Sequence, residues 1–162
     1  MSRSRRRVTL SIRRLAPDEW QTFRKVRLAA LKDAPYAFGS TWKGEKDRSQ
    51  GEWRQAVASR LRFVAVLDDQ VVGMAAGGDS NSTGTAALTS LWVEPGSRGR
   101  GIGDRLVIQV LEWAKATGFN QVLLWVTEGN LHAEALYLRH GFVRTGEVIE
   151  QPRPEFEMAR PI

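Results

Sequence analysis

Apolar residues in the first part of the chain follow two different periods. Residues 8–15 alternate between apolar and polar side chains, which is the pattern of a half-buried strand. Residues 16–35 carry apolar side chains at helical spacing, and Pro17, Asp18 and Pro35 suit the two ends of a helix. The apolar positions of that helix are Trp20, Phe23, Val26, Leu28 and Leu31. The pattern predicts a strand followed by an amphipathic helix.

The segments that follow are separated by polar stretches. Residues 36–51 contain aromatic side chains without a clear period, so we expect a loop that leads into a second helix near residues 52–61. Residues 62–78 hold two β-rich runs on either side of the polar residues 68–70, which predicts a hairpin. Residues 79–85 are expected to form a polar loop after it.

A strand, a helix and another strand come next, in an order that indicates parallel pairing. Residues 87–93 are predicted to be a strand, and residues 102–117 an amphipathic helix that ends at Gly118. Residues 121–126 form a continuous apolar run, as expected of a strand covered on both faces. The connection between the two strands should be a right-handed crossover.

The last segments predict one more helix and two closing strands. Asn130 can cap a helix over residues 131–141 that ends at Gly141. Residues 142–148 and 155–160 have the composition of strands. Neither an internal repeat nor a second domain is evident in the pattern.

Composition limits the class of protein. With 162 residues, of which 42% are hydrophobic, residues 8–162 should form one globular domain with an ordinary core. The chain has no cysteine and two histidines, which argues against a disulfide framework, a thiolate nucleophile and a metal site. No apolar run approaches the roughly 20 residues of a membrane span, and no apolar signal segment follows Met1. We expect a cytoplasmic protein with no membrane partner.

The net charge of +6 is concentrated at one end of the chain. Four of these charges come from Arg3, Arg5, Arg6 and Arg7. We interpret residues 1–7 as a solvated, disordered arm. The binding of nucleic acid through this arm is the weaker alternative, since the rest of the chain is nearly balanced in charge.

Three glycines and three arginines stand where the predicted strand 87–93 turns into a helix. Gly99, Gly101 and Gly103 permit a tight turn that exposes successive N–H groups at a helix start, which predicts a phosphate cradle. Arg98, Arg100 and Arg105 would add positive charge around it. The stretch lacks the Lys and Ser or Thr of a nucleotide P-loop, and its G-x-G-x-G spacing differs from the dinucleotide fingerprint.

At these residues the sequence resembles the GNAT superfamily of acyl-CoA-dependent N-acyltransferases. Arg98, Gly101 and Gly103 match the superfamily's Q/R-x-x-G-x-G/A signature at the strand-to-helix turn. A second pattern of the superfamily is matched downstream by Asn130, Ala133, Tyr137, Gly141 and Phe142. Residues 1–60 match only in the order of elements.

The resemblance implies an α/β fold in one domain, with a mixed, mostly antiparallel sheet flanked by helices and splayed between two central parallel strands. It also implies that acetyl-CoA enters this gap, paired with the backbone of residues 91–93, with its pyrophosphate on the N–H groups of residues 98–104 and its arm against Asn130. The implied donor-binding residues are Leu91, Trp92, Val93, Arg98, Gly99, Arg100, Gly101, Ile102, Gly103, Asp104 and Asn130. From the residues alone, Asn130 is explained almost as well as a helix cap.

The reaction implied by the resemblance is direct transfer in a ternary complex, without a metal. A primary amine, on a small molecule or a peptide, would attack the acetyl-CoA thioester, and the Tyr137 hydroxyl would protonate the leaving thiolate. Without the resemblance, Tyr137 is more simply a core residue. A noncatalytic acyl-CoA-binding regulatory domain is the alternative function.

Two parts of the site are left open by the sequence. The general base could be Glu94, Glu128 or water near Thr89 and Ser90, because residues 86–93 contain no carboxylate. The aromatic residues of the predicted loop could form a wall for the acceptor or could cover the core from outside. These residues are Tyr36, Phe38 and Trp42. His132 and His140 are interpreted as surface or packing residues, and a homodimer is left open.

Overall fold

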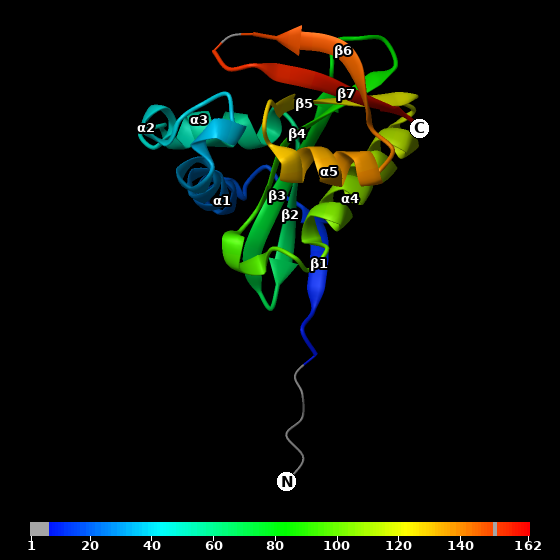
Figure 1. Ribbon diagram of the computed structural model, residues 1–162. Coiled ribbons are helices and arrows are strands. Elements are labelled where there is room, and N and C mark those ends of the chain that lie inside the picture. The colour runs from blue at the N-terminus through cyan, green and yellow to red at the C-terminus, as the bar shows by residue number, and fades with distance from the viewer. Residues whose placement is uncertain (1–6, 151) are drawn as a thin grey trace.

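The computed structural model describes residues 7–150 and 152–162, which form seven strands in one sheet with the order β1-β2-β3-β4-β5-β7-β6. Figure 1 shows this sheet through the centre of the molecule. The strands are β1 (Leu10–Arg14), β2 (Leu61–Leu67), β3 (Gln70–Asp79), β4 (Thr85–Val93), β5 (Gln121–Thr127), β6 (Val143–Ile149) and β7 (Glu155–Pro161). All neighbouring strands are antiparallel except β4 and β5. The mixed, mostly antiparallel sheet is therefore confirmed.

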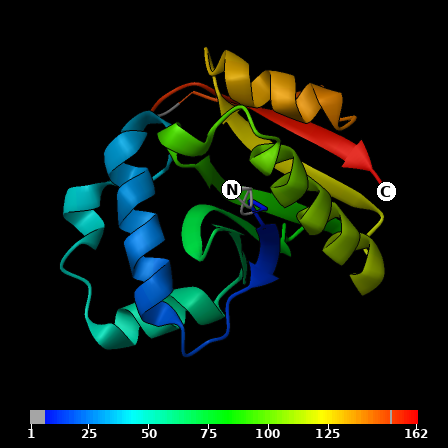
Figure 2. The same cartoon turned by 90° about the horizontal axis from the view of Figure 1, so that it is seen from below.

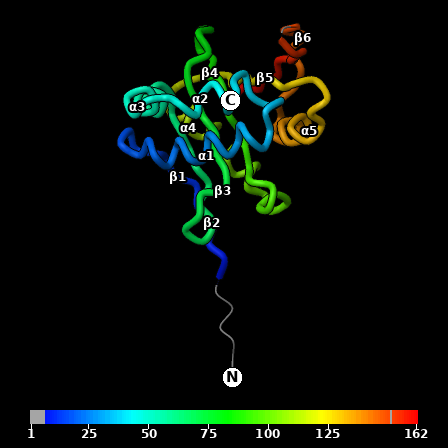
Figure 3. The backbone as a smooth tube through the Cα atoms, turned by 90° about the vertical axis from the view of Figure 1, so that its left-hand side faces the viewer, coloured from blue at the N-terminus to red at the C-terminus, as the bar shows by residue number. Residues whose placement is uncertain are grey.

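Helices cover both faces of the sheet. They are α1 (Trp20–Asp33), α2 (Trp42–Glu45), α3 (Gln50–Ala58), α4 (Ile102–Thr117) and α5 (Leu131–Arg139), with short 3₁₀ turns at Pro35–Ala37 and Pro95–Ser97. Figures 1 and 3 show α1, α2 and α3 grouped together, and Figure 2 shows α1 and α4 on opposite sides of the sheet. The helices therefore form two outer layers around the strands.

Alternation along β2 divides the core into two clusters. Phe63 and Ala65 pack in the cluster that contains the buried face of α4. Val64 lies in the second cluster, which contains buried residues of α1 and α3. Successive side chains of a strand point to opposite faces, so a single strand contributes to both cores.

The parallel strands β4 and β5 pair only where they begin. Their ladder joins Thr85, Ala86 and Ala87 to residues 121–123. Farther along, β5 continues its pairing with β7 up to Thr127, while β4 follows β3. The predicted splay between two central parallel strands is confirmed, and it opens at the carboxyl ends of both strands.

An irregularity in β4 lies beside this opening. The β3–β4 register shifts between Met74 and Ala76, and Ser90 has a φ of 56°. A serine in the left-handed region within a strand marks a bulge, which redirects the neighbouring side chains. The alternation of residues 87–93 did not predict it.

Local turns explain where several elements begin. Asp68 and Asp69, with φ of 47° and 64°, form the two-residue turn of the predicted β2–β3 hairpin. Helix α1 begins at Trp20, shortly after the expected start at Pro17 and Asp18, and the Glu19 carboxylate accepts from the Ala16 N–H at 3.0 Å in the turn before it.

The expectation of a loop over residues 36–51 is wrong in part. Thr41 caps the four-residue helix α2 by accepting from the Gly44 N–H at 3.0 Å. Ser49 and Glu52 form a reciprocal capping box that starts α3 at Gln50. A helix of one turn is too short to show a period, and capping side chains define it instead.

The predicted arm over residues 1–7 lies outside the described residues, apart from Arg7. Within residues 7–150 and 152–162, no helix has both the length and the apolar character needed to cross a membrane.

Candidate active site

The first of two cavities lies where β4 and β5 diverge. This splay cavity, of about 490 Å³, is bounded by the end of β4, the glycine-rich turn and α5. It is lined by ten of the eleven predicted donor-binding residues. They are Leu91, Trp92, Val93, Arg98, Gly99, Gly101, Ile102, Gly103, Asp104 and Asn130. The eleventh, Arg100, is exposed on the turn outside this lining.

The glycine-rich turn presents backbone donors to the splay cavity. Gly99 and Gly101 have φ of 78° and 75°, the left-handed conformation that glycine adopts without steric cost. Among the described residues, no backbone acceptor pairs with the N–H groups of residues 99–104. Since α4 begins at Ile102, these groups coincide with the positive end of its dipole. The turn is therefore able to bind an anion.

The Arg98 side chain is already engaged with protein atoms. Its Nε donates to the Val93 carbonyl at 3.0 Å and its Nη2 to the Asp33 carboxylate at 2.8 Å. Asp33 also accepts from the Trp92 indole N–H at 2.9 Å. Arg98 thus ties the turn to β4 and to the end of α1. A second arginine of this stretch, Arg105, donates to the Leu10 carbonyl at 3.2 Å.

Helix α5 borders the splay cavity at its beginning, and residues at its end contact the first turn of α4. Asn130 caps the helix by accepting from the Ala133 N–H at 3.3 Å, and it lines the splay cavity as well. The Asp104 Oδ1 atom lies 2.7 Å from His140 Nε2 and 3.1 Å from Arg139 Nη2. Partial burial raises the pKa of Asp104, but the hydrogen bonds from these two partners outweigh it and hold the pKa below its usual value. His140 therefore packs against a carboxylate of α4.

Tyr137 lies in the core rather than in the lining of the splay cavity. Its side chain is 7% exposed and packs edge-on against Phe142, with ring centroids 5.9 Å apart. Burial raises the pKa of the Tyr137 hydroxyl well above its usual value, because the phenolate would lose its hydration. The hydroxyl consequently stays protonated at any physiological pH.

The residues left open as a general base separate into two groups. Glu94 and Glu128 are both exposed. Thr89 and Ser90 lie at the β4 bulge, where Ser90 accepts from Arg27 at 3.3 Å and the buried Thr89 hydroxyl has no hydrogen-bond partner in the described part of the chain.

The three aromatic residues left open as an acceptor wall do not gather in one place. Tyr36 is half exposed and lines the splay cavity. The Phe38 ring lies under Arg27, whose guanidinium carbon is 5.0 Å from the ring centroid. Trp42 is flanked by Lys32 and Lys46.

The second cavity, of about 580 Å³, lies against α1, α3, β2 and the β4 bulge. We call it the arginine cavity, because Arg27, Arg48, Arg60 and Arg62 line it. Sequence analysis missed it, since Arg27 and Arg48 are distant in the chain from Arg60 and Arg62 and no motif connects them. Glu45 gave no signal either, because residues 36–51 were expected to form a loop and a carboxylate there is unremarkable until its burial is known.

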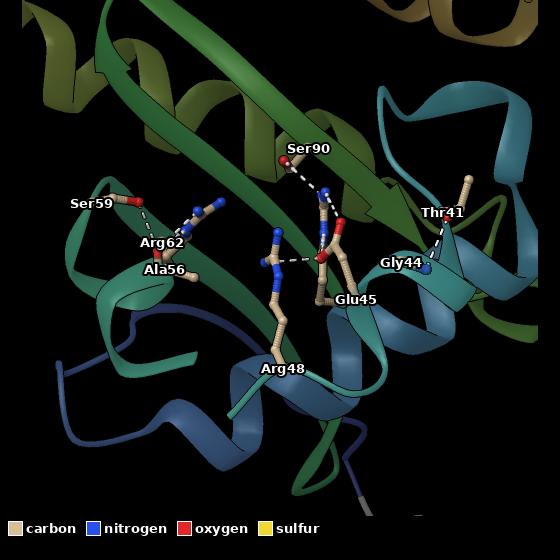
Figure 4. Close-up of polar contacts among 9 residues, drawn as sticks. Thr41, Gly44, Glu45, Arg48, Ala56, Ser59, Arg62 and Ser90 are labelled. Atoms are coloured by element: carbon tan, nitrogen blue, oxygen red, sulfur yellow. Dashed lines mark hydrogen bonds and ion pairs between the residues drawn. The ribbon is translucent and has the colours of Figure 1, made fainter. Parts of the chain in front are cut away.

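Glu45 organises one side of the arginine cavity. It is 1% exposed and accepts two hydrogen bonds from Arg27, at 3.1 and 3.0 Å, while Arg48 lies 3.2 Å from it. Burial raises the pKa of Glu45, but Arg27, the Ser40 hydroxyl and Arg48 together outweigh that effect and lower the pKa below 4.5. Figure 4 shows Arg48 extending beside Glu45 toward the space below Ser90.

Comparisons with known proteins agree with this geometry. Residues 17–142 match the family model described as "Acetyltransferase (GNAT) family". The N-acetylaspartate synthetase of Danio rerio is 35% identical over 92 residues, which are 57% of this chain and 33% of that protein. The mycothiol acetyltransferase of Beutenbergia cavernae is 40% identical over 58 residues, 36% of this chain and 20% of that protein. The chain thus spans a third or less of the length of these curated relatives.

Solved structures share the fold at low identity. A phosphinothricin acetyltransferase from Sinorhizobium meliloti in complex with acetyl-CoA has a TM-score of 0.77 at 17% identity, covering 95% of this chain and 89% of that one. A ribosomal-protein-alanine N-acetyltransferase from Brucella melitensis has a TM-score of 0.76 at 20% identity, covering 94% and 99%.

Proposed function

We propose that this chain, which belongs to the acetyltransferase (GNAT) family, transfers an acetyl group from acetyl-CoA to a primary amine by direct attack in a ternary complex. The observation that carries the proposal is a row of N–H groups on residues 99–104 that have no backbone acceptor among the described residues, at the start of α4 and at the edge of the splay cavity. Every helix start leaves its first N–H groups without an intrahelical acceptor, and here the glycine turn extends that row to residues 99–101 beside an opening in the sheet.

The splay cavity has the chemistry that acetyl-CoA requires. The N–H groups of the glycine-rich turn would hold its pyrophosphate, and the backbone of residues 91–93, which β5 does not pair, would hold its amide-containing arm. Asn130 would contact the same arm beside the α5 start. Arg98 would act mainly by fixing the turn, because Val93 and Asp33 occupy its guanidinium.

Groups of this chain would supply the two proton transfers that the reaction at the thioester requires. The amine nitrogen forms a bond to the carbonyl carbon, the carbon–sulfur bond breaks, the nitrogen loses one proton and the thiolate gains one. Tyr137, whose protonated hydroxyl is buried outside the lining of the splay cavity, would donate a hydrogen bond and a proton to the sulfur if the thioester of a bound donor extends beyond that lining toward the core. Water at Thr89 and Ser90 would accept the proton of the amine, since Glu94 and Glu128 lie at the surface.

An amine-panel assay that detects the free thiol of coenzyme A tests this proposal. The panel includes polyamines, amino acids, aminoglycosides and peptide N-termini, and aspartate belongs in it because several relatives are named N-acetylaspartate synthetases. Turnover of at least one amine, with the acetyl group recovered on its nitrogen, supports the proposal. Binding of acetyl-CoA without turnover across the panel would favour the noncatalytic regulatory domain instead.

A further inference from the structure

Positive charge exceeds negative charge in the arginine cavity. Its lining contains four arginines and one glutamate, Glu52, and the buried Glu45 stands behind it. Glu45 already pairs with Arg27 and Arg48, and Glu52 is bonded to Ser49 in the capping box. In the chain as described, neither Arg60 nor Arg62 has an ion-pair partner. Guanidinium groups in excess at one cavity indicate an anionic ligand.

Arg62 shows how unfavourable the uncompensated charge is. Burial lowers the pKa of Arg62 to about 10, and the neighbouring Arg27, Arg60 and Arg48 add to the effect while Glu45 opposes it. Its Nε and Nη2 donate to the Ala56 carbonyl at 3.3 and 3.0 Å, which satisfies hydrogen bonding but supplies no full negative charge. An anion in the cavity would remove this repulsion.

The arginine cavity and the splay cavity are lined by consecutive residues of β4. Thr89 and Ser90 line the arginine cavity, and Leu91 lines the splay cavity. Consecutive residues of a regular strand point to opposite faces, and the bulge at Ser90 is what lets Thr89 and Ser90 line the same cavity. The Thr89 hydroxyl is buried and has no hydrogen-bond partner within the described residues. A molecule held by the arginines would lie beside the strand whose next residues line the proposed donor site.

The arginines surround the cavity from several elements rather than forming one cluster. Arg27 belongs to α1, Arg48 precedes α3, and Arg62 belongs to β2. Figure 4 shows Arg48 and Arg62 approaching the space below Ser90 from different elements. Guanidinium groups on separate walls suit two separate carboxylates better than one compact anion.

We propose that the acceptor is a small amine carrying two carboxylates, which Arg48, Arg60 and Arg62 bind while its amino group faces the β4 bulge. This inference rests on the proposed function, and it names the substrate class for that same site. The transfer step is unchanged: carbon–nitrogen bond formation, carbon–sulfur bond cleavage, and one proton moving from nitrogen to solvent and one to sulfur. Cationic polyamines are excluded by the same charges.

Binding of a dicarboxylate without an amine tests the cavity separately from catalysis. Titration calorimetry at low salt compares succinate, inorganic phosphate and putrescine as probes of the full chain. We expect saturable binding of succinate, weaker binding of phosphate and no binding of putrescine. Absence of saturable succinate binding, or tighter binding of phosphate, would overturn the proposal.

Substitution of single arginines tests whether succinate binds in the arginine cavity. Arg60→Gln and Arg62→Gln should each weaken succinate binding about tenfold, the effect of losing one charge-assisted hydrogen bond. Arg54→Gln is the matched control, because Arg54 is an exposed arginine of α3 outside the cavity lining. Arg60 is also exposed, so Arg60→Gln should fold even where Arg62→Gln does not. Equal weakening in the control would contradict the proposal.

Steady-state kinetics distinguish the proposed acetyltransferase function from the proposed class of acceptor. We expect a kcat/KM for aspartate at least about tenfold above that for glycine or putrescine, with a higher KM in Arg60→Gln. Efficient acetylation of putrescine and glycine without preference for a dicarboxylate would refute the acceptor class and leave the acetyltransferase function intact. Succinate binding with no acetylation of any amine would refute the function, and with it the acceptor role of the cavity.

Discussion

Arg98 donates to the carboxylate of Asp33 at 2.8 Å across 65 positions of the chain. The contact joins the glycine-rich turn to the last residue of α1, and the Trp92 indole shares the same carboxylate. We propose that the arginine of the family signature acts in this chain as a positioning residue for the turn. Its effect on a bound donor should therefore pass through Asp33.

A double-mutant cycle tests this relationship. Arg98→Gln and Asp33→Asn should each weaken acetyl-CoA binding about three- to tenfold in calorimetry, because the turn loses its tie to α1. The double variant should be little worse than either single variant. An Arg98→Gln effect far larger than that of Asp33→Asn would show a direct contact with phosphate. Asp18→Asn, at an exposed position before α1, serves as the control.

Gly101→Ala should weaken acetyl-CoA binding and destabilise the fold. Gly101 has a φ of 75°, so an alanine there would cost about 1 kcal/mol of unfolding free energy and would displace the N–H donors. Gly118→Ala is a matched control, because Gly118 has a φ of 100° at the far end of α4. Urea denaturation should show similar losses for both variants, while only Gly101→Ala changes the Kd for acetyl-CoA. Equal affinity in the two variants would remove the glycine-rich turn from the donor site.

Replacing Gly103 tests how closely the donor approaches α4. A Cβ at Gly103 would lie 3.3 Å from Leu136 Cδ2, a flexible side-chain end, so Gly103→Val should remain folded. The added side chain would enter the splay cavity and should raise the Kd for acetyl-CoA at least about tenfold. Unchanged affinity by calorimetry in the folded variant would contradict the assignment.

Tyr137→Phe should lower kcat by roughly 10²- to 10⁴-fold with little change in acetyl-CoA binding. Burial raises the pKa of Tyr137, so kcat should show no loss from its deprotonation between about pH 6 and 9. Tyr36→Phe is the control, since Tyr36 lines the splay cavity and is 50% exposed, whereas Tyr137 is buried outside that lining. A kcat within about threefold of wild type in Tyr137→Phe would make Tyr137 a packing residue only.

The free energy of unfolding should depend on pH through the protonation of Glu45. Its pKa is lower in the folded chain than its ordinary value of 4.5, so it stabilises the fold above that pH, and the stabilisation is lost as the pH falls through the folded pKa. Glu45→Gln, which leaves Arg27 and Arg48 without their counter-charge, should lose about 3 kcal/mol at pH 7. Urea denaturation from about pH 6 to 3 should show a smaller loss of stability in this variant than in wild type. Glu112→Gln, at an exposed position of α4, should behave like wild type.

Features that depend on neighbouring residues were predictable. The β2–β3 hairpin, helix α4 with its C-terminal glycine, and the cap of α5 follow from periods and turn residues that act over a few positions. The same holds for the glycine-rich turn, whose left-handed residues require glycine. Helix α2 and the Ser90 bulge were missed, because one side-chain cap defines the first and pairing with β3 produces the second.

The sequence by itself determined the order of strands and helices apart from the one-turn helix α2, the glycine-rich turn and the two motifs that resemble one superfamily, since each is encoded by residues close together in the chain. Only the tertiary structure decided which charges meet. Asp33 reaches Arg98 across the chain, and Glu45 becomes buried between Arg27 and Arg48. Arg60 and Arg62 face the same cavity without a carboxylate of their own in the described chain. Coulomb energies depend on distance and burial, which no spacing along a sequence specifies.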